Sequence, residues 1–183
     1  MGIPNIDKEK FISKVAELGY TILQERDNTF SLNLNEVNSR EIKIRLIISE
    51  PVIERIHGSH NGNKIQAIGY FKLKLPKKFN EPNIYIFAFS NTPDNKVEFV
   101  IIPFSELISR LNARNRIVNS DREIEIVFWL MPDSSLYETT NIGAEGEWYF
   151  MSKGKGGRMA DETEWDYTTF LNNWDQLLHI NIG

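Results

Sequence analysis

Apolar positions near the start of the chain repeat with the period of a helix. Phe11, Val15 and Leu18 recur at intervals of three and four residues over 7–18, so they lie on one face. Asp7 stands where a side-chain oxygen can accept a hydrogen bond from a free backbone N–H of the first turn. The pattern therefore predicts a short amphipathic helix packed against a flat surface.

Most later apolar runs have the two-residue period or the short continuous form of strands. Side chains alternate in 41–48 and in the second half of 65–75, whereas 84–89 and 97–102 are almost wholly apolar. The glycine- and asparagine-rich stretch 50–63 is predicted to be a loop. The predicted strands are 20–25, 30–34, 41–48, 65–75, 84–89, 97–102, 123–130 and a short one at 147–152.

Two more helices are predicted in the second half of the chain. Ser105 can cap a helix that runs through Leu111. A final helix is predicted over 161–178, because large apolar side chains recur there every three or four residues. These side chains are Tyr167, Phe170, Leu171, Trp174 and Leu177.

The order of these elements predicts an α+β (α/β) protein with a mixed central β-sheet flanked by helices. We expect one domain over 1–183, with a core at about 7–130 and a helical C-terminal extension at about 131–183. An apolar content of 41% supports a globular core, and the absence of cysteine excludes thiolate metal sites.

Charge and hydropathy limit the partners. A net charge of −4 argues against sequence-independent coating of nucleic acid, which needs a strong positive field, although it allows a local basic groove. No apolar run reaches the roughly 20 residues that span a bilayer. We therefore expect a cytoplasmic protein with no membrane contact.

One strand carries candidate catalytic residues. Glu41 and Lys43 are two positions apart and project from the same face, and Asp27 lies in the preceding turn. Asp27 and Glu41 could hold Mg²⁺ through their oxygens, while Lys43 offsets charge on an attacked phosphate. The predicted catalytic set is therefore Asp27, Glu41 and Lys43, with Asp27 and Glu41 as metal ligands.

The order of helix, strand, strand after an acid, strand with Glu-x-Lys, further strands and helix resembles the PD-(D/E)xK, or restriction-endonuclease-like, superfamily over 7–111. The resemblance implies a restriction-endonuclease-like core and a metal-dependent nuclease site. A different alignment assigns Arg45 and Ile47 to the Glu and Lys positions, and that version has no catalytic pair. The site is then degenerate.

Basic and histidine residues offer further binding chemistry. His57 and His60 could bind zinc or lie exposed in a loop. Cationic side chains on the strand 65–75 and in the loop KGKGGR could contact phosphates, or could protect a sheet edge and form a hairpin tip. The predicted nucleic-acid-binding residues are Lys72, Lys74, Lys153, Lys155 and Arg158.

The sequence leaves three functions open. The first is a metal-dependent nuclease, and the second is the same scaffold bound to DNA or RNA with a degenerate or inactive site. The third is a non-enzymatic α+β protein-interaction module of the adaptor or immunity type, whose acidic surface engages a basic partner. An exposed edge strand could also support a homodimer.

Overall fold

The computed structural model describes residues 6–34, 41–50, 59–60, 63–64, 66–75, 82–91, 96–113, 123–139 and 166–178. The helices are α1 (Ile6–Glu17), α2 (Phe104–Ala113) and the 3₁₀ turns η3 (Thr168–Phe170) and η4 (Trp174–Leu177). The strands are β1 (Tyr20–Arg26), β2 (Thr29–Leu34), β3 (Glu41–Ile48), β4 (Ser59–His60), β5 (Asn63–Lys64), β6 (Ala67–Leu73), β7 (Ile84–Asn91), β8 (Lys96–Pro103), β9 (Ile124–Leu130) and β10 (Leu136–Thr139).

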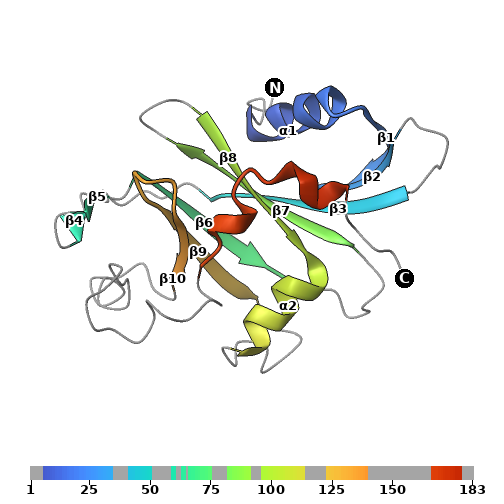
Figure 1. Ribbon diagram of the computed structural model, residues 1–183. Helices are drawn as coiled ribbons and strands as arrows, with labels where there is room; N and C mark the ends of the chain where they lie inside the picture. Colours follow the sequence, from blue (N-terminus) through green and yellow to red (C-terminus); the bar gives the residue numbers. More distant parts are fainter. Residues whose placement is uncertain are drawn as a thin grey trace.

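Eight of these strands form two sheets (Figure 1). The five-stranded sheet has the order β1-β2-β3-β7-β8, and all its pairs are antiparallel except β3–β7. The three-stranded sheet has the order β10-β9-β6 and is antiparallel. The two sheets are joined after β3, where the Glu50 N–H donates to the Tyr70 carbonyl at 2.8 Å. The α+β class is confirmed.

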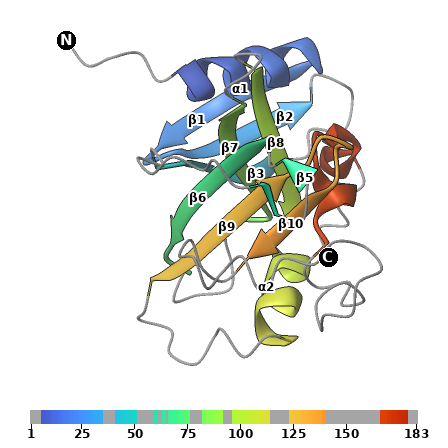
Figure 2. The same cartoon turned by 90° about the vertical axis from the view of Figure 1, so that its left-hand side faces the viewer.

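The five-stranded sheet is the middle layer of the fold. One face packs against α1 and η4, and the other packs against the three-stranded sheet and α2 (Figures 1 and 2). Large side chains between the two sheets are Phe71, Tyr85, Phe87, Phe89, Phe128 and Tyr167. Those beneath α1 are Phe11, Phe30, Ile44, Ile86 and Phe99. The predicted mixed sheet flanked by helices is present, and a second sheet, which the sequence did not predict, also packs on the face that α2 contacts.

The central position of Phe71 depends on a glycine. Its ring packs edge-on against Phe87 and Phe128, with centroids 5.1 and 5.7 Å away. A Cβ at Gly69 would lie 2.6 Å from Cε2 of Phe71 and 3.0 Å from Cγ of Phe89. Only glycine leaves room for this aromatic packing.

The final predicted helix is wrong over its described part. Residues 166–178 form η3 and η4, separated by Leu171 in an extended conformation and by Asn172 with a φ of 51°. Leu171 pairs with Val100 of β8, and the Asn172 N–H donates to the Phe99 carbonyl at 2.6 Å. The repeat of apolar residues is compatible with short turns as well as with a helix. The pairing of Leu171 with β8 interrupts a continuous helix.

The boundary expected near residue 130 does not divide the core. Leu136, Tyr167 and Phe170 lie between the sheets, and Leu177 lies in the cluster beneath α1. The segment 50–63, predicted to be a loop, includes β4, which pairs with β5. The strand predicted at 147–152 lies outside the described residues. None of the described helices has the length and apolar character needed to cross a bilayer.

Candidate functional site

Asp27 occupies the turn between β1 and β2. Asp27 and Asn28 have φ values of 50° and 58°, as expected for the two central residues of a tight hairpin turn of type I′. The Asp27 side chain is 85% exposed, and its carboxylate lies 3.7 Å from Nε of Arg26. Its position is explained by turn chemistry alone, since Asp and Asn tolerate positive φ.

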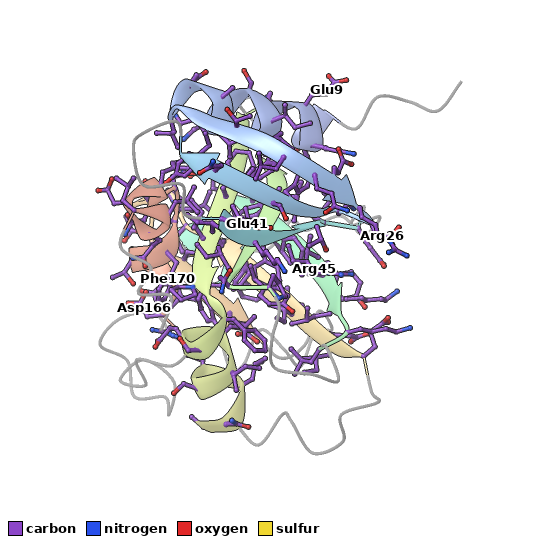
Figure 3. The ribbon with its side chains drawn as sticks, turned by 90° about the vertical axis from the view of Figure 1, so that its right-hand side faces the viewer. Glu9, Arg26, Glu41, Arg45, Asp166 and Phe170 are labelled. Atoms are coloured by element: carbon purple, nitrogen blue, oxygen red, sulfur yellow. The ribbon has the colours of Figure 1, made fainter. Side chains whose placement is uncertain are left out.

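Glu41 and Lys43 lie on one face of β3, with Lys43 at the middle of the β2–β3 ladder and Glu41 at the end farthest from the turn. Asn33 is paired with Glu41, whereas the Asn28 carbonyl accepts a hydrogen bond from the Leu46 N–H at 2.8 Å. Glu41 is thus five residues from the level of the turn, which corresponds to about 17 Å at about 3.4 Å per residue. Figure 3 shows Arg26 and Arg45 toward one end of the strands and Glu41 farther along β3.

This separation means that the predicted set does not form one site. A shared cation requires ligand oxygens within roughly 2.0–2.6 Å of the ion, so two ligating carboxylates lie within about 5 Å of each other. Asp27 and Glu41 cannot meet that condition across the ladder. In the part of the chain that the structure describes, no group of three His, Asp or Glu side chains could hold a metal ion.

The residues of β3 nearest the turn are those of the alternative alignment. Arg45 pairs with Thr29, and its Nη1 atom lies 3.5 Å from the Thr29 hydroxyl. Ile47 packs against the core between the sheets. The positions level with Asp27 therefore carry a cation and an aliphatic side chain, which provide no carboxylate for metal binding.

Lys72, one of the two predicted phosphate-contacting lysines at β6, is paired with a carboxylate. Lys72 lies on the outer face of the three-stranded sheet and forms an ion pair with Glu50 at 3.0 Å, which raises the pKa of Lys72. The Tyr70 hydroxyl donates to Glu125 at 2.7 Å, and this hydrogen bond raises the pKa of Tyr70. Lys74 is exposed at the strand end. One of the two lysines is therefore paired with a carboxylate, and carboxylates stand beside Lys72 and Tyr70 on this face.

The other sequence-predicted residues are not assembled by the described structure. Lys153, Lys155, Arg158 and His57 lie outside the described residues. His60 is in β4, which pairs only with β5 among the described strands.

Three of the four edges of the two main sheets carry an additional bridge. Val100 of β8 pairs with Leu171, Tyr137 of β10 pairs with Asp166, and Tyr70 of β6 pairs with Glu50. Among the described residues, β1 pairs with β2 alone. Among the described residues, the outer side of β1 is the one edge of the two main sheets without an additional bridge, and we call it the open edge.

The open edge has apolar side chains and an irregular centre. Leu23 has no partner in the ladder because the register shifts between Ile22 and Gln24, which makes Leu23 the extra residue of a β-bulge. It is 56% exposed, and Leu18, just before the strand, is 37% exposed. Two of the three exposed large apolar side chains in the described residues thus lie at or beside β1.

Two residues that are unusual in the structure, Leu23 and Glu98, were not identified from the sequence. Leu23 falls within an expected strand, but nothing in the sequence identifies that strand as an edge. Glu98 is a carboxylate at an inward position of β8, where only 3% of its surface is exposed. A charged residue in an otherwise apolar strand was the available signal for Glu98, since buried charges need dedicated partners.

Comparison with family models, curated proteins and solved structures finds no match to this chain.

Proposed function

We propose that the protein is a non-enzymatic interaction module that binds an extended segment of a partner protein along β1. The observation that carries this proposal is the open edge of β1 beside three bridged edges. An unpaired edge offers a row of backbone N–H and C=O groups, to which a peptide strand can add. Exposed Leu18 and Leu23 add apolar contacts next to that backbone.

The bulge favours a partner segment over a second copy of the chain. If two β1 strands paired antiparallel about Leu23, both bulges would fall at the same level and interrupt the new ladder twice. Beyond Leu23 the strand continues with polar residues, and Glu25 forms an ion pair with Lys8 of α1. The part of β1 suited to strand addition is therefore Tyr20–Leu23.

Leu23→Lys tests this proposal, because a lysine on an edge opposes strand addition. Leu178→Lys is the matched control, since Leu178 is 57% exposed and lies at the end of η4, away from β1. Both changes are at exposed positions, so each should alter the free energy of unfolding by about 0.5 kcal/mol or less. Extended peptides selected from a random display library on the native protein should bind Leu178→Lys normally and Leu23→Lys at least tenfold more weakly.

Amide hydrogen exchange then locates the peptide. Binding should slow exchange within Tyr20–Leu23, because new backbone hydrogen bonds form there. Selected peptides that bind both variants equally, or that leave these amides unprotected, would refute the proposal. Sedimentation of the native protein alone tests whether a second copy of the chain binds at this edge. A dimer that Leu23→Lys abolishes would show that the ligand of β1 is a second copy and not a segment of another protein.

A second candidate is nucleic-acid binding on the degenerate core. The element order from α1 through the β1–β3 meander supports the restriction-endonuclease-like layout, although no helix is described between β3 and β7. The observation favouring a phosphate ligand is that Lys43 and Arg45 project from one face of β3. Binding of single-stranded DNA or RNA should weaken with salt and in the Lys43→Ala and Arg45→Ala variants. Salt-independent binding, or none at low salt, would remove this candidate.

A further inference from the structure

A cavity of about 370 Å³ lies where the two sheets meet the C-terminal segment. Its walls come from β8, the start of β6, the β9–β10 connection and residues 168–172, which lie side by side in Figures 1 and 2. The volume is at the lower end of the range of about 300–1,000 Å³ typical of ligand sites. Its polar lining residues are Gln66, Lys96, Glu98, Ser134, Thr168 and Asn172.

A buried carboxylate lines this cavity. Glu98 pairs with Phe89 in the β7–β8 ladder, and its side chain is only 4% exposed. One oxygen accepts a hydrogen bond from Nδ2 of Asn172 at 2.5 Å, and the other lies 3.0 Å from Nζ of Lys96. An ionised carboxylate has about four acceptor positions, so these two contacts leave capacity for further donors.

The two partners of Glu98 differ in how firmly they are held. Asn172 is fixed by a backbone hydrogen bond to Phe99 at 2.6 Å and by a second from the Phe99 N–H to its Oδ1 atom at 3.0 Å. Lys96 is 60% exposed at the beginning of an edge strand. An exposed lysine can return to water at little cost. The carboxylate is therefore rigidly placed, with one cation that can be displaced.

We propose that this cavity binds a guanidinium group, with Glu98 as its acceptor and Lys96 as the cation it displaces. A guanidinium is planar, always charged and carries five N–H donors, so it can occupy both carboxylate oxygens at once. The side-chain oxygens of Gln66, Ser134 and Thr168 on the cavity wall can accept the donors that remain. This site is separate from the β1 edge and does not depend on it.

Three probes test the ligand chemistry. Agmatine represents a small-molecule source, acetyl-Gly-Arg-Gly-amide represents an arginine of a partner protein, and acetyl-Gly-citrulline-Gly-amide is the uncharged isostere. Calorimetry or NMR titration should detect agmatine, the arginine peptide or both, and should detect no binding of the citrulline peptide. Binding of agmatine alone identifies a small molecule, and binding of the peptide alone identifies a protein partner. Equal binding of the citrulline peptide, or no binding of any probe, would overturn the proposal.

Two substitutions in the site should act in opposite directions. Glu98→Gln removes the acceptor charge and should weaken guanidinium binding at least tenfold. Lys96→Met removes the competing cation and should strengthen binding severalfold, an effect that no general loss of folding could produce. Glu125→Gln, on the outer face of β9, is the control and should bind as the native protein does. Unchanged affinity in both Glu98→Gln and Lys96→Met would refute the assignment.

Discussion

Replacing Tyr85 with phenylalanine removes a hydroxyl from the core and leaves its aromatic packing in place. The Tyr85 ring is completely buried and stacks on Phe104, with centroids 5.5 Å apart. Its hydroxyl is buried and has no hydrogen-bond partner among the described residues. A buried hydroxyl without a partner costs about 1–3 kcal/mol of desolvation. Tyr85→Phe should therefore leave the free energy of unfolding at pH 7 unchanged or raise it by about 1 kcal/mol.

The same hydroxyl makes stability depend on alkaline pH. Burial raises the pKa of Tyr85 from 10.0 to about 12, and the nearby charge of Arg45 offsets part of that rise. Because the folded pKa is the higher one, this stabilisation of the neutral form is complete below pH 10 and is lost as the pH rises toward 12. At pH 11 the native protein should have lost about 1.4 kcal/mol relative to Tyr85→Phe, which has no such group.

Urea unfolding of both proteins at pH 7, 9 and 11 measures this difference directly. Tyr70→Phe is the contrasting variant, since it removes a hydroxyl that donates to Glu125 at 2.7 Å and should cost about 0.5–1 kcal/mol at pH 7. A Tyr85→Phe variant destabilised by more than about 1 kcal/mol at pH 7 would contradict this prediction. A parallel loss of stability in the native protein and the variant between pH 9 and 11 would contradict it as well.

Three further predictions address packing, backbone and chemistry. Gly69→Ala should cost about 1–3 kcal/mol in urea unfolding because its Cβ meets the Phe71 ring at 2.6 Å, and adding Phe71→Leu should recover part of that loss. Asn172→Ala should be about 1 kcal/mol less stable than Asn172→Gly, since both lose the side-chain hydrogen bonds but only alanine is strained at a φ of 51°. Lys43→Ala should match the native protein in a Mg²⁺- or Mn²⁺-dependent nuclease assay, and a selective loss of metal-dependent cleavage in the variant would contradict the geometry of β3.

The strands were predictable because their alternation is local, but their partners were not. The pattern over 41–48 predicts β3 with the correct ends, since inward Ile42, Ile44 and Leu46 alternate with polar residues. The run 65–75 was likewise recognised as a strand, yet nothing local indicates that β6 leaves the sheet of β7 and β8 to join β9. That choice depends on packing between residues distant in the chain.

The predicted ligands Asp27 and Glu41 lie apart because β2 and β3 are antiparallel. Asp27 and Glu41 are close in sequence order, one before β2 and one opening β3. An antiparallel pair brings the start of one strand to the end of the next, so the turn that holds Asp27 lies next to Arg45 and Leu46 rather than Glu41. The register, and not the residue types, separates the predicted ligands.

The hydrogen bonds that join Asn172 to Phe99 and Glu98 of β8 can form only after residue 172 has been synthesised. Phe99 and the Asn172 side chain that accepts its N–H are 73 positions apart. At about 5–20 residues per second, a ribosome needs roughly 4–15 s to make the chain between them. Throughout that interval β8 lacks its bridge to Leu171, and Glu98 lacks the amide of Asn172. The β8 edge therefore gains this cover only after every described strand has been synthesised, and codon-dependent pausing within this stretch would lengthen the delay.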